Sequence, residues 1–221
     1  MGTISTRVWD LPTRVFHWAL AACIVGSILT ASIGGNAIGW HFRFGYAILA
    51  LVLFRLVWGF AGPRYARFSS FPPNPAAAIA HLRGHATPGV GHNPLGAFSV
   101  YALLLALAVQ VGTGLFANDD IMWEGPLRPL VSNAASEWLT RAHRINRLVV
   151  IGLIALHLAA VAFYAFVKKE RLVRAMIDGD RDVDAALPPP PAEDGARVRA
   201  TALALFACCA LVAWLVVTQL R

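Results

Sequence analysis

Five apolar stretches of about 20 residues alternate with polar segments along this chain. As a helix, a run of that length crosses the roughly 30 Å hydrocarbon core of a bilayer. The predicted spans are residues 15–33, 43–60, 97–116, 148–167 and 201–220. The pattern therefore predicts an all-α fold: a polytopic membrane four-helix bundle followed by a fifth, C-terminal transmembrane helix.

The polar segments between these spans indicate how the helices are connected. A short glycine-rich link joins the first two spans, which predicts antiparallel neighbours. Residues 61–96 are rich in proline, glycine and histidine and too polar to span, and a weak helix over 76–85 is expected to lie along the membrane surface. Four prolines at 188–191 predict a stiff linker before the last span. We expect three parts: a core at 1–175, a charged cytoplasmic linker at 176–198 and a transmembrane helix at 199–221.

A cleaved signal peptide is the alternative for the first span. Arg14 would end its positively charged region, and small residues at 30–32 would suit cleavage. The apolar run is long for a signal peptide, and it begins with His17 and Trp18, an unusual pair for a discarded segment. We therefore expect the first span to be retained.

Composition and charge support a multi-pass membrane protein. The chain is 57% hydrophobic and 14% charged, outside the usual range of soluble domains, and its formal net charge is +7. The basic residues cluster beside the apolar spans, which indicates membrane topology and interaction with lipid rather than nucleic-acid binding. An N-terminus inside the cell places about twelve basic residues on the cytoplasmic side and about six outside, as the positive-inside rule requires. The predicted topology is multi-pass with the N-terminus in the cytoplasm.

The cysteines exclude one way of holding a cofactor. Cys23, Cys208 and Cys209 all lie in apolar runs, and the chain contains no Cys-x-x-Cys-His motif. This pattern indicates neither a disulfide framework nor a covalently attached c-type haem. Any cofactor is therefore expected to bind noncovalently.

Four histidines are predicted to form two pairs at two depths in the membrane. His157 follows His143 by fourteen positions, which on one helix is roughly 21 Å of rise and a return to within about 40° of the same direction. With the N-terminus inside, His17 shares the cytoplasmic level with His157, and His41 shares the outer level with His143. The pairing follows from the depth and direction of the spans.

Paired imidazoles at two depths are what two bis-histidine b haems need, because each iron takes one axial nitrogen from either side of a flat macrocycle. With both axial positions filled, the iron has no vacant site for oxygen, which favours electron transfer; we assign no catalytic residue. For any single histidine the alternative is a packed or interfacial residue bonded to a carbonyl. Ionisable groups within spans are costly and usually functional, which favours the haem interpretation for the set of four.

Two arginines are candidate partners for haem propionates. Arg55 follows His41 by fourteen positions, so it faces the same way roughly 21 Å deeper, beside the proposed cytoplasmic haem. Snorkelling to the interface is the alternative for this residue. Arg43 lies at the outer mouth of its span, where it would serve the outer haem or act as an ordinary headgroup anchor.

The remaining histidines give weaker signals. His81 and His85 stand one helical turn apart and would suit a metal, but no third ligand is evident, so solvated loop residues are the favoured interpretation. His92 precedes the third span and is interpreted as a loop or capping residue, with a place beside a quinone pocket as the alternative.

The sequence resembles the bacterial cytochrome b561 family, which includes the b-type cytochrome subunits of nickel-iron hydrogenases. The resemblance covers about residues 8–175. It rests on VWD at 8–10, LPTRVFHW at 11–18, HFRFGYAIL at 41–49, RLVWGFAGPRYARFSSF at 55–71, HNPLG at 92–96, GLFANDDI at 114–121 and the two histidines of the fourth span.

The resemblance implies a core of four helices that holds two b haems, with the same histidine pairs that depth predicts. It also implies electron transfer between the quinone pool and a periplasmic redox partner, such as a c-type cytochrome or a redox enzyme. Quinol:acceptor oxidoreductase activity would be the enzymatic form of this function. The fifth span, after the proline-rich linker, departs from the simplest four-helix members.

Two other functions stay open from the sequence. A superoxide oxidase coupled to quinone reduction would need a cationic funnel outside, whereas the loop at 118–140 mixes acidic and basic residues and is a candidate docking surface. A histidine-based metal-ion transporter would need ligands clustered at the midplane, and the predicted spans lack Asp and Glu.

Overall fold

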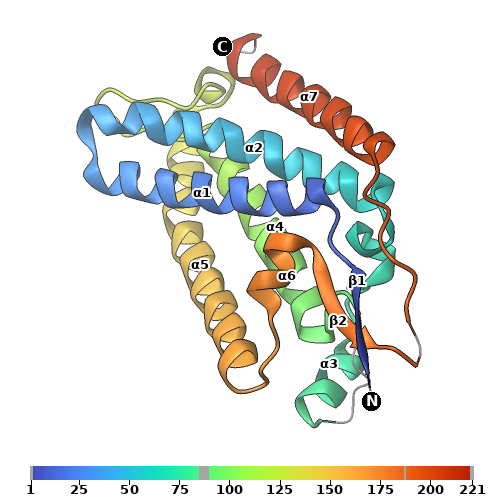
Figure 1. Cartoon of the computed structure of the whole chain (residues 1–221). Coiled ribbons are helices and arrows are strands. Elements are labelled where there is room, and N and C mark those ends of the chain that lie inside the picture. The colour runs from blue at the N-terminus through green and yellow to red at the C-terminus, as the bar shows by residue number, and fades with distance from the viewer. Residues whose placement is uncertain (1, 85–89, 187, 220–221) are drawn as a thin grey trace. The chain divides into compact units, whose positions relative to one another are not determined.

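Long helices dominate the computed structural model, which describes residues 2–84, 90–186 and 188–219 (Figure 1). Within these ranges five helices are long and apolar enough to cross a membrane. They are α1 (Leu11–Ile33), α2 (Ile38–Ala61), α4 (Pro94–Gly114), α5 (Asn133–Phe166) and α7 (Ala196–Gln219). The prediction of an all-α, polytopic membrane fold is confirmed.

Shorter elements lie between the long helices. The short α-helices are α3 (Pro75–Leu82) and α6 (Leu172–Asp178), and the strands are β1 (Thr3–Arg7) and β2 (Asp180–Asp184). Single 3-10 turns occur at Gly35–Ala37, Arg64–Ala66, Phe68–Ser70 and Arg128–Leu130.

Helix α5 begins at Asn133, before the predicted fourth span, which starts at residue 148. The prediction followed the lipid-soluble run, whereas the helix starts in a polar segment at a local cap: the Ser132 hydroxyl accepts a hydrogen bond from the Ala135 amide at 3.3 Å. His143 and His157 therefore both lie within one continuous helix, as the fourteen-residue argument requires.

Helix α3 confirms the predicted helix after the second span, with different ends. It covers Pro75–Leu82 rather than 76–85, and residue 85 lies outside the described ranges. Asn74 caps its start, because the side-chain oxygen accepts a hydrogen bond from the Ala77 amide at 3.0 Å and Pro75 occupies the first turn.

The chain divides into two units, each described here by itself. Unit 1 comprises Met1–Val15, Leu56–Ala102 and Leu153–Leu203, and unit 2 comprises Phe16–Arg55, Leu103–Gly152 and Ala204–Arg221. Each of the five long helices contributes residues to both units.

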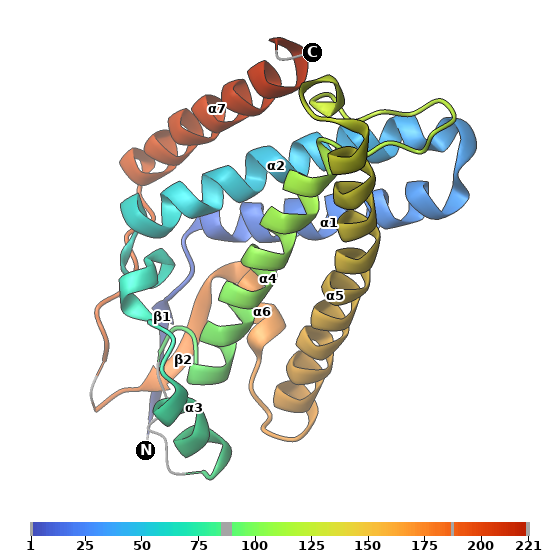
Figure 2. The same ribbon diagram turned by 180° about the vertical axis from the view of Figure 1, so that it is seen from behind.

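In unit 1 the two strands pair antiparallel, from Thr3 opposite Asp184 to Arg7 opposite Asp180, and they lie side by side in both views (Figure 2). Next to them is a buried cluster of Val8, Trp9, Tyr65, Ala175 and Ala192. Strand β2 and part of α6 fall within the segment predicted as a linker. The sequence analysis missed this pairing because the charged run at 180–184 has no apolar alternation, and its partner strand lies at the other end of the chain.

Asp10 caps helix α1 from a fully buried position in unit 1. Its carboxylate accepts hydrogen bonds from the Thr13 amide at 2.9 Å, the Thr13 hydroxyl at 2.8 Å and the Trp58 indole at 3.2 Å. Burial raises the pKa of Asp10, while the hydrogen bonds from Thr13 and Trp58 oppose that rise. The cap thus joins the start of α1 to the end of α2.

A second carboxylate, Asp194, ties the two ends of the chain together within unit 1. It lies 3.6 Å from Arg7, 3.7 Å from Arg14 and 3.2 Å from Arg199, and it accepts a hydrogen bond from the Leu11 amide at 3.0 Å. We call Asp194 and these four residues the clasp. The clasp holds the segment before α7 against the start of α1.

In unit 2 aromatic rings connect three helices. Phe54 of α2 packs against Phe16 of α1 with ring centroids 6.3 Å apart, and against Phe206 of α7 at 5.9 Å. A side chain at Gly26 would collide with the ring of Phe44, because a Cβ there would lie 2.6 Å from its Cζ atom. Close packing of α1 on α2 therefore depends on a glycine.

Candidate functional site

His41 and His143 come together in unit 2. His41 lies in α2 and His143 in α5, and their ring centroids are 6.1 Å apart with an interplanar angle of 86°. Two imidazoles bound to opposite faces of one iron have centroids about 6 Å apart, since each metal–nitrogen bond is about 2 Å and each nitrogen lies about 1 Å from its ring centre. The spacing therefore suits two axial ligands of one haem.

Each of these imidazoles is anchored through Nδ1. The Nδ1 atom of His41 lies 3.0 Å from the carbonyl oxygen of Ser27, and that of His143 lies 2.9 Å from the carbonyl oxygen of Gln110. Because a carbonyl only accepts hydrogen bonds, Nδ1 carries the proton in both rings and Nε2 carries the lone pair. Ligating histidines in metalloproteins are commonly oriented by this arrangement.

Gln110 and Asn146 extend the polar environment of His143. Asn146 donates hydrogen bonds to the side-chain oxygen of Gln110 at 2.7 Å and to the carbonyl of Ala106 at 2.8 Å. This orientation turns the Gln110 amide nitrogen toward His143, 3.1 Å from Nε2. The sequence analysis missed both residues, although a glutamine and an asparagine within apolar helices were a readable signal.

Gly114 lets the end of α4 approach the ring of His143. A Cβ at this position would lie 2.9 Å from Cε1 and 3.1 Å from Nδ1 of the imidazole. The imidazole thus occupies space that a side chain at residue 114 would fill. Together with the Nδ1 anchor, this close fit fixes the position of the His143 imidazole against α4, and its role as a haem ligand stays a prediction.

His17 lies in unit 2 and His157 in unit 1. His17 is half-buried in α1, and its ring packs edge-on against Trp18 with centroids 5.1 Å apart. His157 is half-buried in α5. Their pairing stays a prediction.

The two candidate arginines have different surroundings. Arg55 is only 4% exposed, so its side chain does not reach outward as the snorkelling alternative requires. Arg43 is stacked over the ring of Trp40, with its guanidinium carbon 4.5 Å from the ring centroid. Contact of either residue with a propionate remains a prediction.

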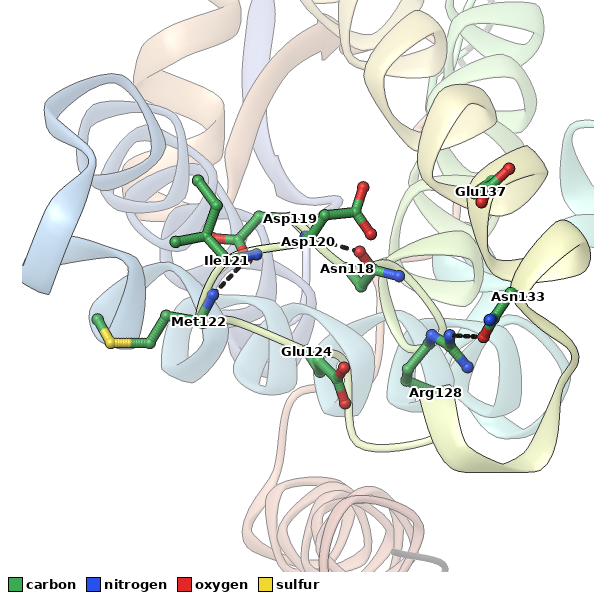
Figure 3. A pocket seen from close by; sticks show the side chains of 9 residues that line it. All are labelled: Asn118, Asp119, Asp120, Ile121, Met122, Glu124, Arg128, Asn133 and Glu137. Carbon is green, nitrogen blue, oxygen red and sulfur yellow. Dashed lines mark hydrogen bonds between the residues drawn. The ribbon is translucent and has the colours of Figure 1, made fainter.

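The loop between α4 and α5 forms an acidic pocket in unit 2 (Figure 3). Its volume is about 370 Å³. Four carboxylates and one guanidinium contribute charge to its lining: Asp119, Asp120, Glu124, Glu137 and Arg128. The loop thus presents a predominantly negative surface.

Local hydrogen bonds fix the shape of this loop. The Asp119 carboxylate accepts hydrogen bonds from the amides of Trp123, Met122 and Ile121 at 2.8, 2.9 and 3.0 Å, and these bonds lower the pKa of Asp119. The fully buried Ser136 donates to the carbonyl of Phe116 at 2.8 Å, which fixes the loop to the start of α5.

The structure gives new surroundings for two of the three weaker histidine candidates, His81 and His92. His81 is not a solvated loop residue: it lies in α3, and its Nε2 atom is 2.6 Å from the hydroxyl of Tyr164. His92 packs among aromatic rings, with centroids 4.2 Å from Phe71 and 4.7 Å from Trp9. His85 lies outside the described residues.

Comparison with known families agrees with this geometry. The family model described as prokaryotic cytochrome b561 matches residues 8–179. The chain belongs to the prokaryotic cytochrome b561 family. As a member of this family of b-type cytochromes it is a multi-pass membrane protein that carries electrons with haem b. The match leaves out β1, β2 and α7, so the strand pair and the fifth long helix are additions to the cytochrome b561 core.

Several relatives of this cytochrome b561 protein carry the name probable Ni/Fe-hydrogenase B-type cytochrome subunit. The Bradyrhizobium diazoefficiens protein is 21% identical, and the alignment covers 82% of this chain and 87% of the relative. The Rhizobium leguminosarum protein is 24% identical over 80% of this chain and 89% of the relative. A relative from Escherichia coli, the hydrogenase 1 subunit, is 23% identical over 51% of this chain and 60% of its own length.

Proposed function

We propose that this cytochrome carries electrons across the membrane through two bis-histidine b haems, between the quinone pool and a redox partner at the outer face. His41 and His143 would hold the outer haem, and His17 and His157 the cytoplasmic one. The observation that carries the proposal is the 6.1 Å spacing of the His41 and His143 rings, with each Nδ1 atom anchored to a carbonyl.

The proposal of a second haem is supported by the geometry of helix α5. Because His143 and His157 lie fourteen residues apart in one continuous helix, their side chains point in similar directions about 21 Å apart. A bilayer core of about 30 Å has room for two haems at these levels. Arg55 lies in α2 at a buried position and is the proposed partner of a propionate of the cytoplasmic haem.

The redox partner is proposed to be an enzyme or a c-type cytochrome. The relatives in Bradyrhizobium and Rhizobium are named as subunits of Ni/Fe-hydrogenases, which favours docking to a redox enzyme. The acidic pocket of the α4–α5 loop would meet a partner with a basic surface, because opposite charges steer association. The proposed location is the bacterial inner membrane with the N-terminus in the cytoplasm, as the distribution of basic residues favours.

The negative charge of the α4–α5 loop bears on the second candidate function, that of a superoxide oxidase. Four carboxylates around the pocket would repel an anion at the outer face, so the observation disfavours superoxide as the substrate. A metal-ion transporter also has little support, because the described residues contain no group of three or more His, Cys, Asp or Glu side chains placed to hold a metal ion.

The pyridine haemochrome stoichiometry of the detergent-purified protein, measured with its dithionite-reduced spectrum, tests the proposal. Two noncovalent b haems per chain would support two bis-histidine sites. One haem per chain would contradict the two-haem wire. If two haems are present, reduction by decylubiquinol tests the quinone connection, and its absence would contradict that part of the proposal.

A further inference from the structure

A histidine and a tyrosine form a short hydrogen bond in unit 1, outside the proposed haem ligands. The Nε2 atom of His81 in α3 lies 2.6 Å from the hydroxyl of Tyr164 in α5. Their rings stack with an interplanar angle of 27° and centroids 6.4 Å apart, and both residues are half-buried. The pair thus connects a titratable group on a short helix to a hydroxyl on the helix that carries His157.

The position of Tyr164 relates it to the proposed cytoplasmic haem. Tyr164 follows His157 by seven residues in α5, which is two turns of helix, so it lies on nearly the same face about 10 Å further along. Lys168 and Lys169 follow this end of α5, where the proposed topology places the cytoplasm. Tyr164 therefore lies between the level of the proposed haem ligand and the aqueous face.

A network of polar contacts next to Tyr164 links the end of α5 to β2 and to the segment before α4. The Glu170 amide donates a hydrogen bond to the carbonyl of Tyr164 at 3.0 Å, and the Glu170 carboxylate pairs with Arg181 of β2 at 3.0 Å. Arg181 also donates to the carbonyls of Val90 and Gly91, just before α4. These contacts hold the backbone next to Tyr164 in place. In the pair itself, the Tyr164 hydroxyl can donate a proton and a His81 ring nitrogen can accept one.

We propose that Tyr164 and His81 form the proton relay of a quinone site beside the cytoplasmic haem. This inference rests on the quinone connection in the proposed function. A quinol loses two protons and two electrons when it is oxidised to a quinone. For the first proton, a quinol O–H bond breaks and the proton passes to the Tyr164 oxygen as the Tyr164 proton moves to His81 Nε2, while His81 releases its Nδ1 proton to water. A turn of the His81 ring then brings the unprotonated nitrogen back toward Tyr164, so that the second proton follows the same route. The two electrons leave the quinol one at a time, each to a haem b that accepts one electron. Quinone reduction follows the same steps in reverse.

The relay assigns a separate role to each residue. Tyr164 exchanges the proton with the substrate oxygen, and His81 exchanges it with the aqueous face. Glu170, whose amide bonds to the Tyr164 carbonyl, forms an ion pair with Arg181 of β2.

Stopped-flow reduction of the haems by decylubiquinol, with the full chain in nanodiscs, tests the relay. We expect His81→Gln and Tyr164→Phe each to slow the reduction about 10²-fold, because general acid–base catalysis contributes rate factors of that order. His81→Gln should also change the pH profile of the reduction rate, because it removes the group that exchanges the proton with water. The matched control is Tyr101→Phe, since the Tyr101 hydroxyl contacts a backbone carbonyl, that of Phe68, at 3.3 Å.

A second measurement is independent of electron transfer. NMR titration of ring-labelled histidine follows the protonation of His81, whose signal is identified by its loss in His81→Gln. We expect Tyr164→Phe to shift the midpoint of this titration, because it removes the hydrogen-bond partner of Nε2. An unchanged midpoint would overturn the pairing.

The outcomes separate the relay from the function on which it rests. Reduction by decylubiquinol in the unmodified protein, with rates and pH profiles unchanged in His81→Gln and Tyr164→Phe, would overturn the relay and leave the quinone connection intact. No reduction of a protein that carries its haems would overturn the quinone connection and the relay together. Equal slowing in Tyr101→Phe would show a structural effect and overturn the assignment.

Discussion

Gly114 at the end of α4 faces the imidazole of His143 so closely that a Cβ at residue 114 would lie 2.9 Å from Cε1 of the ring. Gly112, two residues earlier in the same helix, has no such neighbour within 4 Å. One helix therefore contains both a glycine that the proposed haem ligand requires and a glycine that it does not.

We expect Gly114→Ala to displace the His143 ring and lower the content of the outer haem. Overpacking of this kind typically costs about 1–3 kcal/mol. The measurement is the haemochrome stoichiometry of the purified variant. Gly112→Ala is the matched control and should keep full haem content, whereas equal loss in both variants would mean that the glycines matter for the helix and not for the ring.

Removing one ligand at a time tests the assignment of histidines to haems. We expect His143→Ala to lose the outer haem and keep the cytoplasmic one, and His157→Ala to do the reverse, because one missing axial nitrogen leaves a bis-histidine site incomplete. Each variant should contain about half of the unmodified haem content. Haem-to-protein ratios that stay unchanged in both variants would exclude these histidines as ligands.

The Asp10 cap is expected to stabilise the junction of α1 and α2. Asp10→Ala should lower the free energy of unfolding by about 2 kcal/mol, because it removes the helix cap and leaves the buried Trp58 indole without its acceptor. Thermal unfolding in detergent, followed by circular dichroism, measures the loss. Asp10→Asn keeps an oxygen for the Thr13 amide and the Trp58 indole, so it should unfold close to the unmodified protein.

Asp10 also predicts a pH dependence. Since burial raises its pKa above the usual value of 3.8, the folded protein holds this proton more tightly than the unfolded chain does. The contribution of Asp10 to stability should therefore fall as pH rises from 3.8 through the raised pKa. The difference in stability between the unmodified protein and Asp10→Asn measures this contribution, and a difference that is constant over that range would contradict the prediction.

The contribution of Asp194 to stability should change with pH in the opposite direction to that of Asp10. Burial raises the pKa of Asp194, but the hydrogen bonds from Leu11 and Arg199 and the charges of Arg199 and Arg7 outweigh burial, so the pKa lies below its usual value of 3.8. The stabilisation is therefore complete above 3.8 and is lost as pH falls through the lower folded pKa.

Breaking the clasp should loosen the strand pair. We expect Asp194→Ala to speed hydrogen exchange in β1 and β2 about tenfold or more, because several hydrogen bonds to a charged group are removed. Exchange measured by mass spectrometry at neutral pH gives the rates. Asp182→Ala, at an exposed position in β2, is the control and should exchange like the unmodified protein. Equal rates in Asp194→Ala and the unmodified protein would show that the clasp does not hold the strands.

The sequence by itself determined the membrane spans and the ligand candidates. The length of each apolar run predicts a span, because the thickness of the bilayer sets the length of the helix. The relation of His143 to His157 is equally local: both lie in α5, and helical geometry fixes their separation and direction. The polar residues from Asn133 onward, which extend α5 before the apolar run, could not be recognised as helix from hydrophobicity.

Only the tertiary structure decided what each histidine contacts. The carbonyls of Ser27 and Gln110 that orient His41 and His143 lie on other helices, and so does Gly114. Likewise, the pairing of β1 with β2 and the contact of His81 with Tyr164 join residues far apart in the chain. These contacts depend on how helices and strands pack together, and the period and length of a hydrophobic run carry no information about which distant side chain meets which.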